Sequence, residues 1–324
     1  MPISILVTRR PPGSALNLLT KVGSVDLWPV DEIMPREQLL ARVDGVDALY
    51  CMLTDQIDRE LLDAAPKLRV ISTMAVGVDN VDLIACTRRG IPVGHTPGVL
   101  TEATADLAMG LVLVAARRIV EGTNHVLGGR WGEWQPDLLL GTDVHSSVVG
   151  IVGMGRIGEA VARRARGFGM SIVYTGPHAK PEIEEALAAE RRDLSGLLAV
   201  ADHIVITAPL NADTYHLINA ASIRLMKPTA TLVNVARGPL VDTEALATAL
   251  ASGAIGAAGL DVTDPEPLPA DHPLALLPNC VVTPHIGSAS VQSRADMADL
   301  AARNLISALA GDPMEACANP AVYL

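Results

Sequence analysis

The sequence predicts an α/β protein that is built from two doubly wound domains, each around a parallel β-sheet. Short apolar strands alternate with helical stretches almost from end to end of the 324-residue chain, and this alternation gives parallel strands joined by right-handed crossovers. Only 2% of the residues are aromatic, so Ala, Val, Leu and Ile must build the core, as in sheets that helices cover on both faces. The length suits two domains of ordinary size.

The first series of strands and helices begins at Ile3 and is followed by a long helix. Because this helix, expected over Glu102–Glu121 with Thr101 as its N-cap, is apolar on nearly all sides, it should be buried. The Gly- and Trp-rich segment Gly128–Gly141 is expected to be a functional or interfacial loop. The expected strands are Ile3–Val7, Val25–Trp28, Val46–Cys51 and Val70–Thr73, and the expected helices between them are Ser14–Lys21, Arg36–Val43 and Asp58–Ala65.

A second series starts at Val148 and runs to the last helix. That helix, Val291–Ala310, has an apolar face and is expected to return to the first domain, because the two ends of a chain often lie together. The expected strands are Val148–Val152, Ser171–Tyr174, His203–Thr207, Thr231–Asn234, Ala257–Val262 and Cys280–Val282.

Charge and cysteine content argue against several kinds of partner. The formal net charge is −11 and no basic run occurs, so nucleic acid is not an expected partner. The four Cys lie far apart and form no zinc pattern, so no metal site is predicted. No charged-then-apolar signal segment is visible, and the longest apolar run, Leu107–Ala116, is too short to span a bilayer. We therefore expect a soluble, cytoplasmic protein with no membrane partner.

A dinucleotide site is predicted where the second series begins. Strand Val148–Val152 runs into the GxGxxG motif of residues 153–158, which opens the helix Glu159–Arg166. The glycines allow a tight turn and a close approach to a pyrophosphate, which the helix N-terminus faces with free N–H groups. Because the motif has the required strand before it and helix after it, a cofactor site is favoured over a plain glycine-rich turn.

Three later strand ends should line the same cofactor, because ligands bind at the carboxyl edge of such sheets. They are Thr207–Leu210, Asn234–Gly238 and Gly259–Val262. Pro209 lacks an N–H and would form a flat apolar wall. Asp261 offers an acceptor for a nicotinamide carboxamide, unless it is an ordinary solvated Asp at a strand end.

Three further side chains at consecutive strand ends predict hydride transfer to a 2-oxo acid. They are Arg237, Glu266 and His285. The planar fork of an Arg can bind a carboxylate with two hydrogen bonds. A His can donate and accept a proton near neutral pH, and a neighbouring carboxylate keeps it charged. Each residue alone would be assigned to the surface or the core, but their joint placement favours an active site.

These residues lie in motifs that resemble those of the D-isomer-specific 2-hydroxyacid dehydrogenase family. The matching stretches are GMGRIG (153–158), NVARGPLVD (234–242), GLDVTDPEPLP (259–269) and TPHIGS (283–288), and the resemblance covers nearly the whole chain. Within the family the chain most resembles glyoxylate/hydroxypyruvate reductases, which reduce a small 2-oxo acid to the 2-hydroxy acid, although His95 stands where Tyr is common.

The resemblance implies a flavodoxin-like substrate domain and a Rossmann-like cofactor domain inserted into it. The implied substrate domain covers residues 1–98 and 287–324, and the implied cofactor domain covers residues 99–286. The segment 101–147 would hold a dimerisation helix and loop, so a homodimer is expected.

The resemblance also implies roles for individual residues. Arg237 would bind the carboxylate, His285 would be the general acid/base and Glu266 would pair with His285, while the backbone N–H groups of Val76 and Gly77 would hold the carboxylate as well. The predicted substrate-binding residues are Val76, Gly77, Arg237, His285 and Ser288. The predicted cofactor-binding residues are Thr104, Gly153, Gly155, Arg156, Ile157, Gly158, Thr175, Gly176, Pro177, His178, Pro209, Thr214, Val235, Ala236, Arg237, Asp261, His285 and Gly287.

The segment after the second Rossmann strand predicts a preference for NADP(H). NAD-preferring sites carry an acidic residue there that binds the ribose hydroxyls, but no Asp or Glu occurs between Tyr174 and Glu182. No carboxylate would therefore repel a 2′-phosphate, and we expect NADP(H) to be preferred, with some activity with NAD(H). The candidates for phosphate contacts are Arg156, Thr175, His178 and Lys180.

Two alternatives stay open. A phosphite- or formate-type dehydrogenase would keep the fold and the Arg237, Glu266 and His285 set. An NAD(H)-sensing co-repressor on the same scaffold would act by binding partners rather than by turnover. The second alternative is disfavoured, because the chain ends at Leu324, soon after the last helix, without a long disordered tail.

Overall fold

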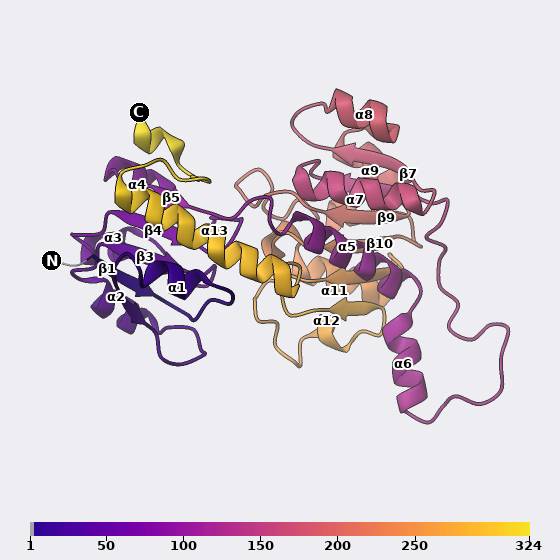
Figure 1. Ribbon diagram of the computed structural model, residues 1–324. Coiled ribbons are helices and arrows are strands. Elements are labelled where there is room, and N and C mark those ends of the chain that lie inside the picture. The colour runs from indigo at the N-terminus through magenta and orange to yellow at the C-terminus, as the bar shows by residue number, and fades with distance from the viewer. Residues whose placement is uncertain (1–2) are drawn as a thin grey trace. The chain divides into compact units, whose positions relative to one another are not determined.

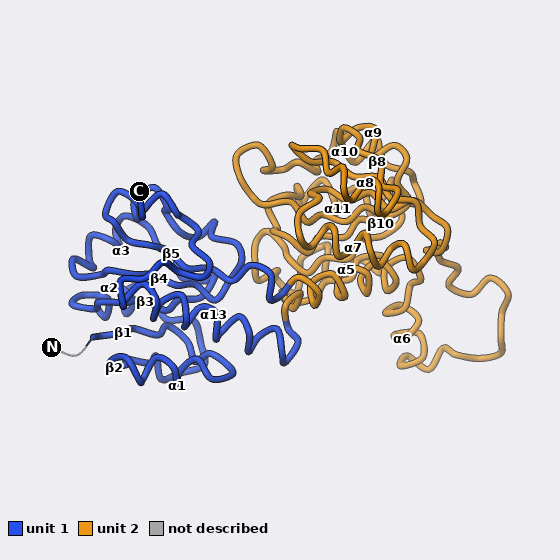
Figure 2. Tube along the Cα trace, turned by 45° about the horizontal axis from the view of Figure 1, so that its top comes forward, with its two compact units in different colours: residues 1–100, 289–324 blue, residues 101–288 orange. Residues whose placement is uncertain are grey.

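The computed structural model describes residues 3–324, which divide into two compact units (Figure 2). Unit 1 comprises the chain up to Leu100 together with Ala289–Leu324, and unit 2 comprises Thr101–Ser288. The second unit is therefore an insertion in the first. The boundaries expected from the sequence, at 98/99 and 286/287, fall close to these junctions.

Unit 1 is a five-stranded parallel sheet with helices on both faces (Figure 1). The strand order β2-β1-β3-β4-β5 is the flavodoxin-like order. One face is covered by α2, α3 and α4, and the other by α1 and α13. The strands are β1 (Ser4–Val7), β2 (Ser24–Leu27), β3 (Ala48–Cys51), β4 (Val70–Thr73) and β5 (Val93–Gly94). The helices are α1 (Ala15–Leu19), α2 (Arg36–Val43), α3 (Arg59–Ala64), α4 (Leu83–Arg88), α13 (Val291–Ala310) and η2 (Pro320–Tyr323).

Helix α13 belongs to unit 1 and has the bounds that the sequence predicts. It begins after Ser290, whose hydroxyl accepts a hydrogen bond from the Ser293 N–H, and it ends at Gly311 with φ of 88°. Its apolar face packs on α1 and on β3, β4 and β5. The Tyr50 hydroxyl donates to the Ala298 carbonyl at 3.1 Å, which joins the helix to β3. The chain end therefore completes the first domain.

Unit 2 is a seven-stranded parallel sheet in the order β12-β11-β10-β9-β6-β7-β8. This is the Rossmann order with one extra strand, and the direction of winding reverses between β6 and β9, where dinucleotides bind in such sheets. The strands are β6 (Val148–Val152), β7 (Ser171–Thr175), β8 (Ala189–Arg191), β9 (His203–Ile206), β10 (Thr231–Asn234), β11 (Ala257–Leu260) and β12 (Cys280–Val282). The helices are α5 (Thr101–Ala116), α6 (Ile119–Leu127), α7 (Arg156–Gly167), α8 (Pro181–Leu187), α9 (Leu194–Val200), α10 (Ala220–Ile223), η1 (Gly238–Leu240), α11 (Thr243–Ser252) and α12 (Pro273–Leu276).

The prediction of one helix over Glu102–Glu121 is wrong. Thr101 is the first helical residue rather than the cap, and α5 ends at Ala116. Arg118 is left-handed, with φ of 54°, and α6 begins after it. The physical reason is a distant contact, because the Thr142 N–H donates to the Ala116 carbonyl at 2.9 Å and so satisfies the end of α5. The buried residues of α5 pack on α7 and on β10, β11 and β12.

Residues 3–324 contain neither a candidate membrane-spanning helix nor a candidate metal cluster. No helix in this range is both long and apolar enough to cross a membrane. Nor does any group of three or more His, Cys, Asp or Glu side chains in the same range have an arrangement that could hold a metal ion.

Candidate dinucleotide and catalytic site

The glycine loop after β6 is shaped by contacts that exclude side chains at two of its glycines. Gly153 has φ of 101°, and a Cβ there would lie 2.7 Å from the backbone of Ala208. A Cβ at Gly158 would lie 2.3 Å from the Gly153 carbonyl oxygen. The Thr207 hydroxyl donates to that same oxygen at 2.6 Å. The loop is therefore fixed by Thr207, which directly follows β9 and for which the sequence suggested no such bond.

Gly155 differs, because open space lies where its Cβ would be. It is the N-cap of α7, no side chain caps the helix, and Arg156 and Ile157 begin the first turn. The free N–H groups of that turn, together with the helix dipole, suit a phosphate. The loop thus offers the close backbone approach that a pyrophosphate needs, and these residues fit a dinucleotide. The structure starts the helix at Arg156, earlier than the expected Glu159.

The segment after β7 lies beside the glycine loop. The Gly153 N–H donates to the Thr175 carbonyl at 2.9 Å, and a Cβ at Gly176 would lie 3.9 Å from the Met154 nitrogen. Pro177 and His178 follow on the surface. Thr175, Gly176 and Met154 are therefore brought together where the adenosine ribose of a bound dinucleotide would lie in this fold.

Arg237 is held in place by the strand that precedes it. The side-chain amide of Asn234 donates to the Arg237 carbonyl at 2.7 Å, and the Ala236 N–H donates to the Asn234 side-chain oxygen at 3.0 Å. The Arg237 Nη1 donates to the Ala236 carbonyl at 2.8 Å. A Cβ at Gly238 would lie 1.9 Å from the Thr263 carbonyl oxygen, so the Arg237 segment packs directly on the segment that carries Glu266.

Asp261 is a buried structural residue rather than a solvated one. Its relative exposure is 2%, and Oδ1 accepts from the Thr283 hydroxyl at 2.6 Å and from the Ile286 N–H at 2.8 Å. Its Oδ2 accepts from the Gly287 N–H at 2.6 Å. These bonds fix the turn in which His285 has φ of 54°. The carboxylate therefore positions His285, a role that the sequence did not indicate.

His285 and Glu266 form a close pair. The His285 Nδ1 lies 2.6 Å from the Glu266 Oε1, and the carboxylate partner assigns the proton to Nδ1. Burial by itself would raise the pKa of the Glu266 carboxyl. The hydrogen bond and charge of His285, the Thr263 N–H and the Arg237 guanidinium together outweigh burial, and the pKa of Glu266 is lowered. Glu266 is therefore anionic at neutral pH, and it accepts the hydrogen bond from the His285 Nδ1.

The lowered pKa of Glu266 has a consequence for stability. A carboxyl group whose pKa is lower in the folded protein than in the unfolded chain stabilises the fold at pH values above its unfolded pKa. This stabilisation is lost as the pH falls through the folded pKa. The Glu266 carboxylate is thus available to His285 across the neutral range and is lost as a charged partner in acid.

The other predicted cofactor residues of unit 2 occupy three places. Thr104 is buried on α5, and a Cβ at Gly287 would lie 3.4 Å from its methyl group. The Thr214 hydroxyl donates to the Pro209 carbonyl at 2.7 Å and so closes the turn after β9. Val235 and Ala236 follow β10, at the carboxyl edge of the sheet. Ser288, which was predicted to bind substrate rather than cofactor, is the last residue of the unit.

The predicted substrate loop lies in unit 1, after β4. Val76 and Gly77 are half-buried. The His95 Nδ1 lies 3.0 Å from the Val76 carbonyl oxygen, and the Thr96 N–H donates to the Ala75 carbonyl at 2.8 Å. His95 thus braces this loop. The prediction that Val76 and Gly77 offer N–H groups to a carboxylate stays a prediction.

The glycine loop and the paired His285 and Glu266 lie at the carboxyl edge of one parallel sheet, an arrangement that defines a dinucleotide-dependent enzyme. Residues 109–287 match the family described as "D-isomer specific 2-hydroxyacid dehydrogenase, NAD binding domain". The chain belongs to the D-isomer-specific 2-hydroxyacid dehydrogenase family, and its unit 2 carries an NAD(P)-binding domain.

Individual relatives agree with this assignment. A glyoxylate reductase of Thermococcus gammatolerans is 48% identical over 311 residues, which are 95% of this chain and 93% of that protein. A solved protein of Thermus thermophilus has a TM-score of 0.91 and 48% identity, covering 98% of this chain and 100% of that one. An NADPH-dependent glyoxylate/hydroxypyruvate reductase of Sinorhizobium meliloti, solved with NADP and malonate, has a TM-score of 0.85 and 31% identity, covering 98% of this chain and 97% of that one.

Proposed function

We propose that this protein reduces glyoxylate and hydroxypyruvate to the corresponding 2-hydroxy acids, with NADPH as the preferred hydride donor. The observation that carries the proposal is the pair of His285 and Glu266, 2.6 Å apart, beside Arg237 at the carboxyl edge of a dinucleotide-binding sheet. The names of the full-length relatives support the substrate class.

His285 supplies the proton in the proposed reaction. Because Nδ1 is bonded to Glu266, Nε2 is the ring atom that can donate to the carbonyl oxygen of the substrate. The bound nicotinamide supplies the hydride to the carbonyl carbon. His285 thus changes from imidazolium to imidazole as the hydroxyl group forms, and it regains a proton from water. Glu266 stays ionised and stabilises the imidazolium before the transfer.

Arg237 orients the 2-oxo acid. Its guanidinium is always charged and can hold a carboxylate with two parallel hydrogen bonds, which fixes the adjacent carbonyl group relative to His285. Asn234 and the packing of Gly238 on Thr263 hold the Arg237 backbone, so the orientation is set before substrate binds.

A spectrophotometric panel tests the proposed function. The purified enzyme would be assayed with glyoxylate, hydroxypyruvate, pyruvate and phenylpyruvate in the presence of NADPH or NADH, and with phosphite in the presence of NADP⁺ or NAD⁺. The highest kcat/KM is expected with glyoxylate or hydroxypyruvate. Turnover of phosphite alone would contradict the proposal and favour the phosphite-type alternative, and turnover of no substrate would favour a sensing role.

The cofactor preference can be tested at Gly176. Its φ is not positive and its Cβ direction is open up to the Met154 nitrogen at 3.9 Å, so an Asp fits there. Gly176→Asp should lower the ratio of kcat/KM for NADPH to that for NADH by about tenfold, because the new carboxylate accepts from the ribose hydroxyls and repels a 2′-phosphate. Steady-state kinetics with both cofactors measure this ratio.

The control for this change is Gly167→Asp, which adds the same charge at the other end of α7, where its Cβ would also meet open space. Its cofactor ratio should equal that of the wild type. A wild-type enzyme with the higher kcat/KM for NADH would contradict the proposed preference.

The α6 segment supports a proposed homodimer. In Figures 1 and 2, α6 and the chain after it project from the rest of unit 2. Large apolar side chains are exposed on this arm, among them Leu127 at 79% and Trp134 at 84%. Exposed apolar groups gathered on one segment mark an interaction surface, and a second copy is the commonest partner.

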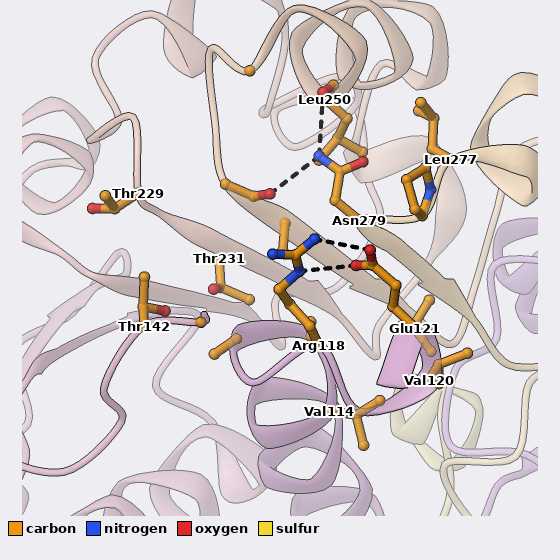
Figure 3. A pocket seen from close by; sticks show the side chains of 18 of the residues that line it. Val114, Arg118, Val120, Glu121, Thr142, Thr229, Thr231, Leu250, Leu277 and Asn279 are labelled. Atoms are coloured by element: carbon orange, nitrogen blue, oxygen red, sulfur yellow. Dashed lines mark hydrogen bonds and ion pairs between the residues drawn. The ribbon is translucent and has the colours of Figure 1, made fainter. Parts of the chain in front are cut away.

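A pocket of about 730 Å³ lies at the base of this arm, by the amino ends of β10, β11 and β12. Figure 3 shows Arg118 paired with Glu121 in its lining, with Asn279 to one side and Thr142 to the other. The Arg118 Nε and Nη2 each lie 2.8 Å from a Glu121 oxygen, so this pair holds the start of α6. The residues that line this pocket, together with α6 and the chain after it, form the face that we propose the second copy covers.

Sedimentation tests the homodimer. At micromolar concentration the protein should sediment as twice the 33.9 kDa chain. Leu127→Glu should yield monomers, because a buried unpaired carboxylate costs several kcal/mol, whereas Ile84→Glu, a change at a 65% exposed apolar residue of unit 1, should leave the dimer intact. A wild-type monomer at this concentration would contradict the proposal.

A further inference from the structure

Arg191 lies against the loop at the adenosine end of the dinucleotide site. It is the last residue of β8, the outermost strand of its sheet, where it is the register partner of Tyr174. Its Nη2 donates to the Gly176 carbonyl at 2.9 Å and to the Pro177 carbonyl at 3.2 Å. One guanidinium nitrogen therefore holds the two residues that follow the second Rossmann strand.

The other end of this loop is held separately. The Lys180 N–H donates to the Tyr174 hydroxyl at 2.8 Å, and the Tyr174 hydroxyl forms a short hydrogen bond with Glu184. Glu184 also accepts from the Lys180 N–H at 3.3 Å. Glu184 of α8 thus accepts a hydrogen bond from the backbone of the loop. The conformation of the loop therefore does not depend on Arg191 alone.

The charge of Arg191 is not matched by a carboxylate. Along the described chain no Asp or Glu forms an ion pair with it, whereas its neighbour Arg192 forms a two-bond pair with Glu190, each bond 2.9 Å long. An Arg is charged at every physiological pH. Its side chain is exposed, so it can meet a ligand anion. A fixed cation thus stands against the loop that follows β7, where the sequence places no acid.

We propose that Arg191 is a specificity-determining residue that recognises the phosphate on the adenosine ribose of NADP(H). This inference rests on the NADPH preference proposed above. It assigns the main positive charge that binds the 2′-phosphate to Arg191, which lies on β8 rather than in the loop after β7. Arg191 holds the Gly176 and Pro177 carbonyls through Nη2. Its other donors then bind phosphate oxygens, for which the guanidinium fork is suited.

Direct binding of nucleotide fragments tests the proposal without turnover. Calorimetry on the full-length enzyme would compare adenosine 2′,5′-bisphosphate with adenosine 5′-monophosphate, which differ only in the ribose phosphate. The wild type should bind the bisphosphate at least about tenfold more tightly, a typical effect of one charge-assisted contact. Arg191→Gln should reduce the ratio of the two affinities to near one while affinity for the monophosphate changes little.

Two further variants sharpen the test. Arg191→Lys keeps the positive charge but loses the planar guanidinium with its parallel donors, so it should retain part of the preference for the bisphosphate. Arg192→Gln removes the neighbouring, paired Arg and should keep the wild-type ratio. In the wild type the ratio should also fall with rising salt, more steeply than in Arg191→Gln, because salt screens an exposed charge.

The outcomes separate the two proposals. Equal affinity of the wild type for both nucleotides would overturn the NADPH preference, and the role of Arg191 with it. A wild-type preference that Arg191→Gln retains would overturn only the role of Arg191. Equal loss of both affinities in Arg191→Gln would also overturn it, because the residue would then serve only to hold the loop.

Discussion

Replacing His285 should lower kcat for reduction by roughly 10²–10⁴-fold, the usual contribution of a positioned general acid. His285→Ala removes the proton donor whose Nδ1 is bonded to Glu266 at 2.6 Å. Because His285 has φ of 54°, Ala also strains the backbone, and His285→Asn is the better variant, since Asn tolerates a left-handed conformation. Steady-state kinetics with glyoxylate and NADPH measure the loss.

Three measurements make this prediction specific. The affinity for NADPH, measured by calorimetry, should change little in His285→Asn. The melting temperature should stay near that of the wild type, which excludes a folding defect. His145→Asn, at an exposed position whose side chain is 73% accessible, should leave kcat unchanged. Wild-type turnover in either His285 variant would show that another group donates the proton.

The regular parts of the fold could be predicted from local sequence. Buried strands of four or five apolar residues between turn signals were placed within two residues of their ends, and the last helix was placed at both ends, because its periodicity and its caps, Ser290 and Gly311, are local signals. The short strands Val93–Gly94 and Ala189–Arg191 were not predicted, since segments of two and three residues show no hydrophobic period. The end of α5 was missed because it depends on Thr142, far along the chain.

The positions of the three candidate catalytic residues at strand ends could also be predicted from the sequence. Placing Arg237, Glu266 and His285 at strand ends follows from chain order in a parallel sheet, and the structure pairs His285 with Glu266. The bonds that hold them were not predictable. The sequence indicates only that Asp261 is an acid at the end of a strand. Its burial and its three hydrogen bonds depend on the turn that follows β12. Arg191 reaches the cofactor loop only through the pairing of β8 with β7.

Arg237→Lys should raise KM for the 2-oxo acid by about 10–100-fold, which corresponds to the roughly 1.5–3 kcal/mol of a hydrogen bond to a charged group. Lys keeps the charge but cannot form two parallel bonds with a carboxylate. The effect should fall on the 2-oxo acid more than on NADPH. Because the Arg237 charge contributes to the lowered pKa of Glu266, Lys should preserve the acidic limb of the pH profile, whereas Arg237→Ala should move it to higher pH.

The comparison of the Lys and Ala variants of Arg237 therefore separates geometry from charge. If KM rises in both variants but the acidic limb moves only in Arg237→Ala, the fork binds the carboxylate and the charge supports Glu266. Arg224→Lys, at an exposed position at the end of α10, is the matched control and should behave as the wild type. If Arg237→Lys weakens only the binding of NADPH, Arg237 serves the cofactor, and the cation that binds the 2-oxo acid lies elsewhere in the chain.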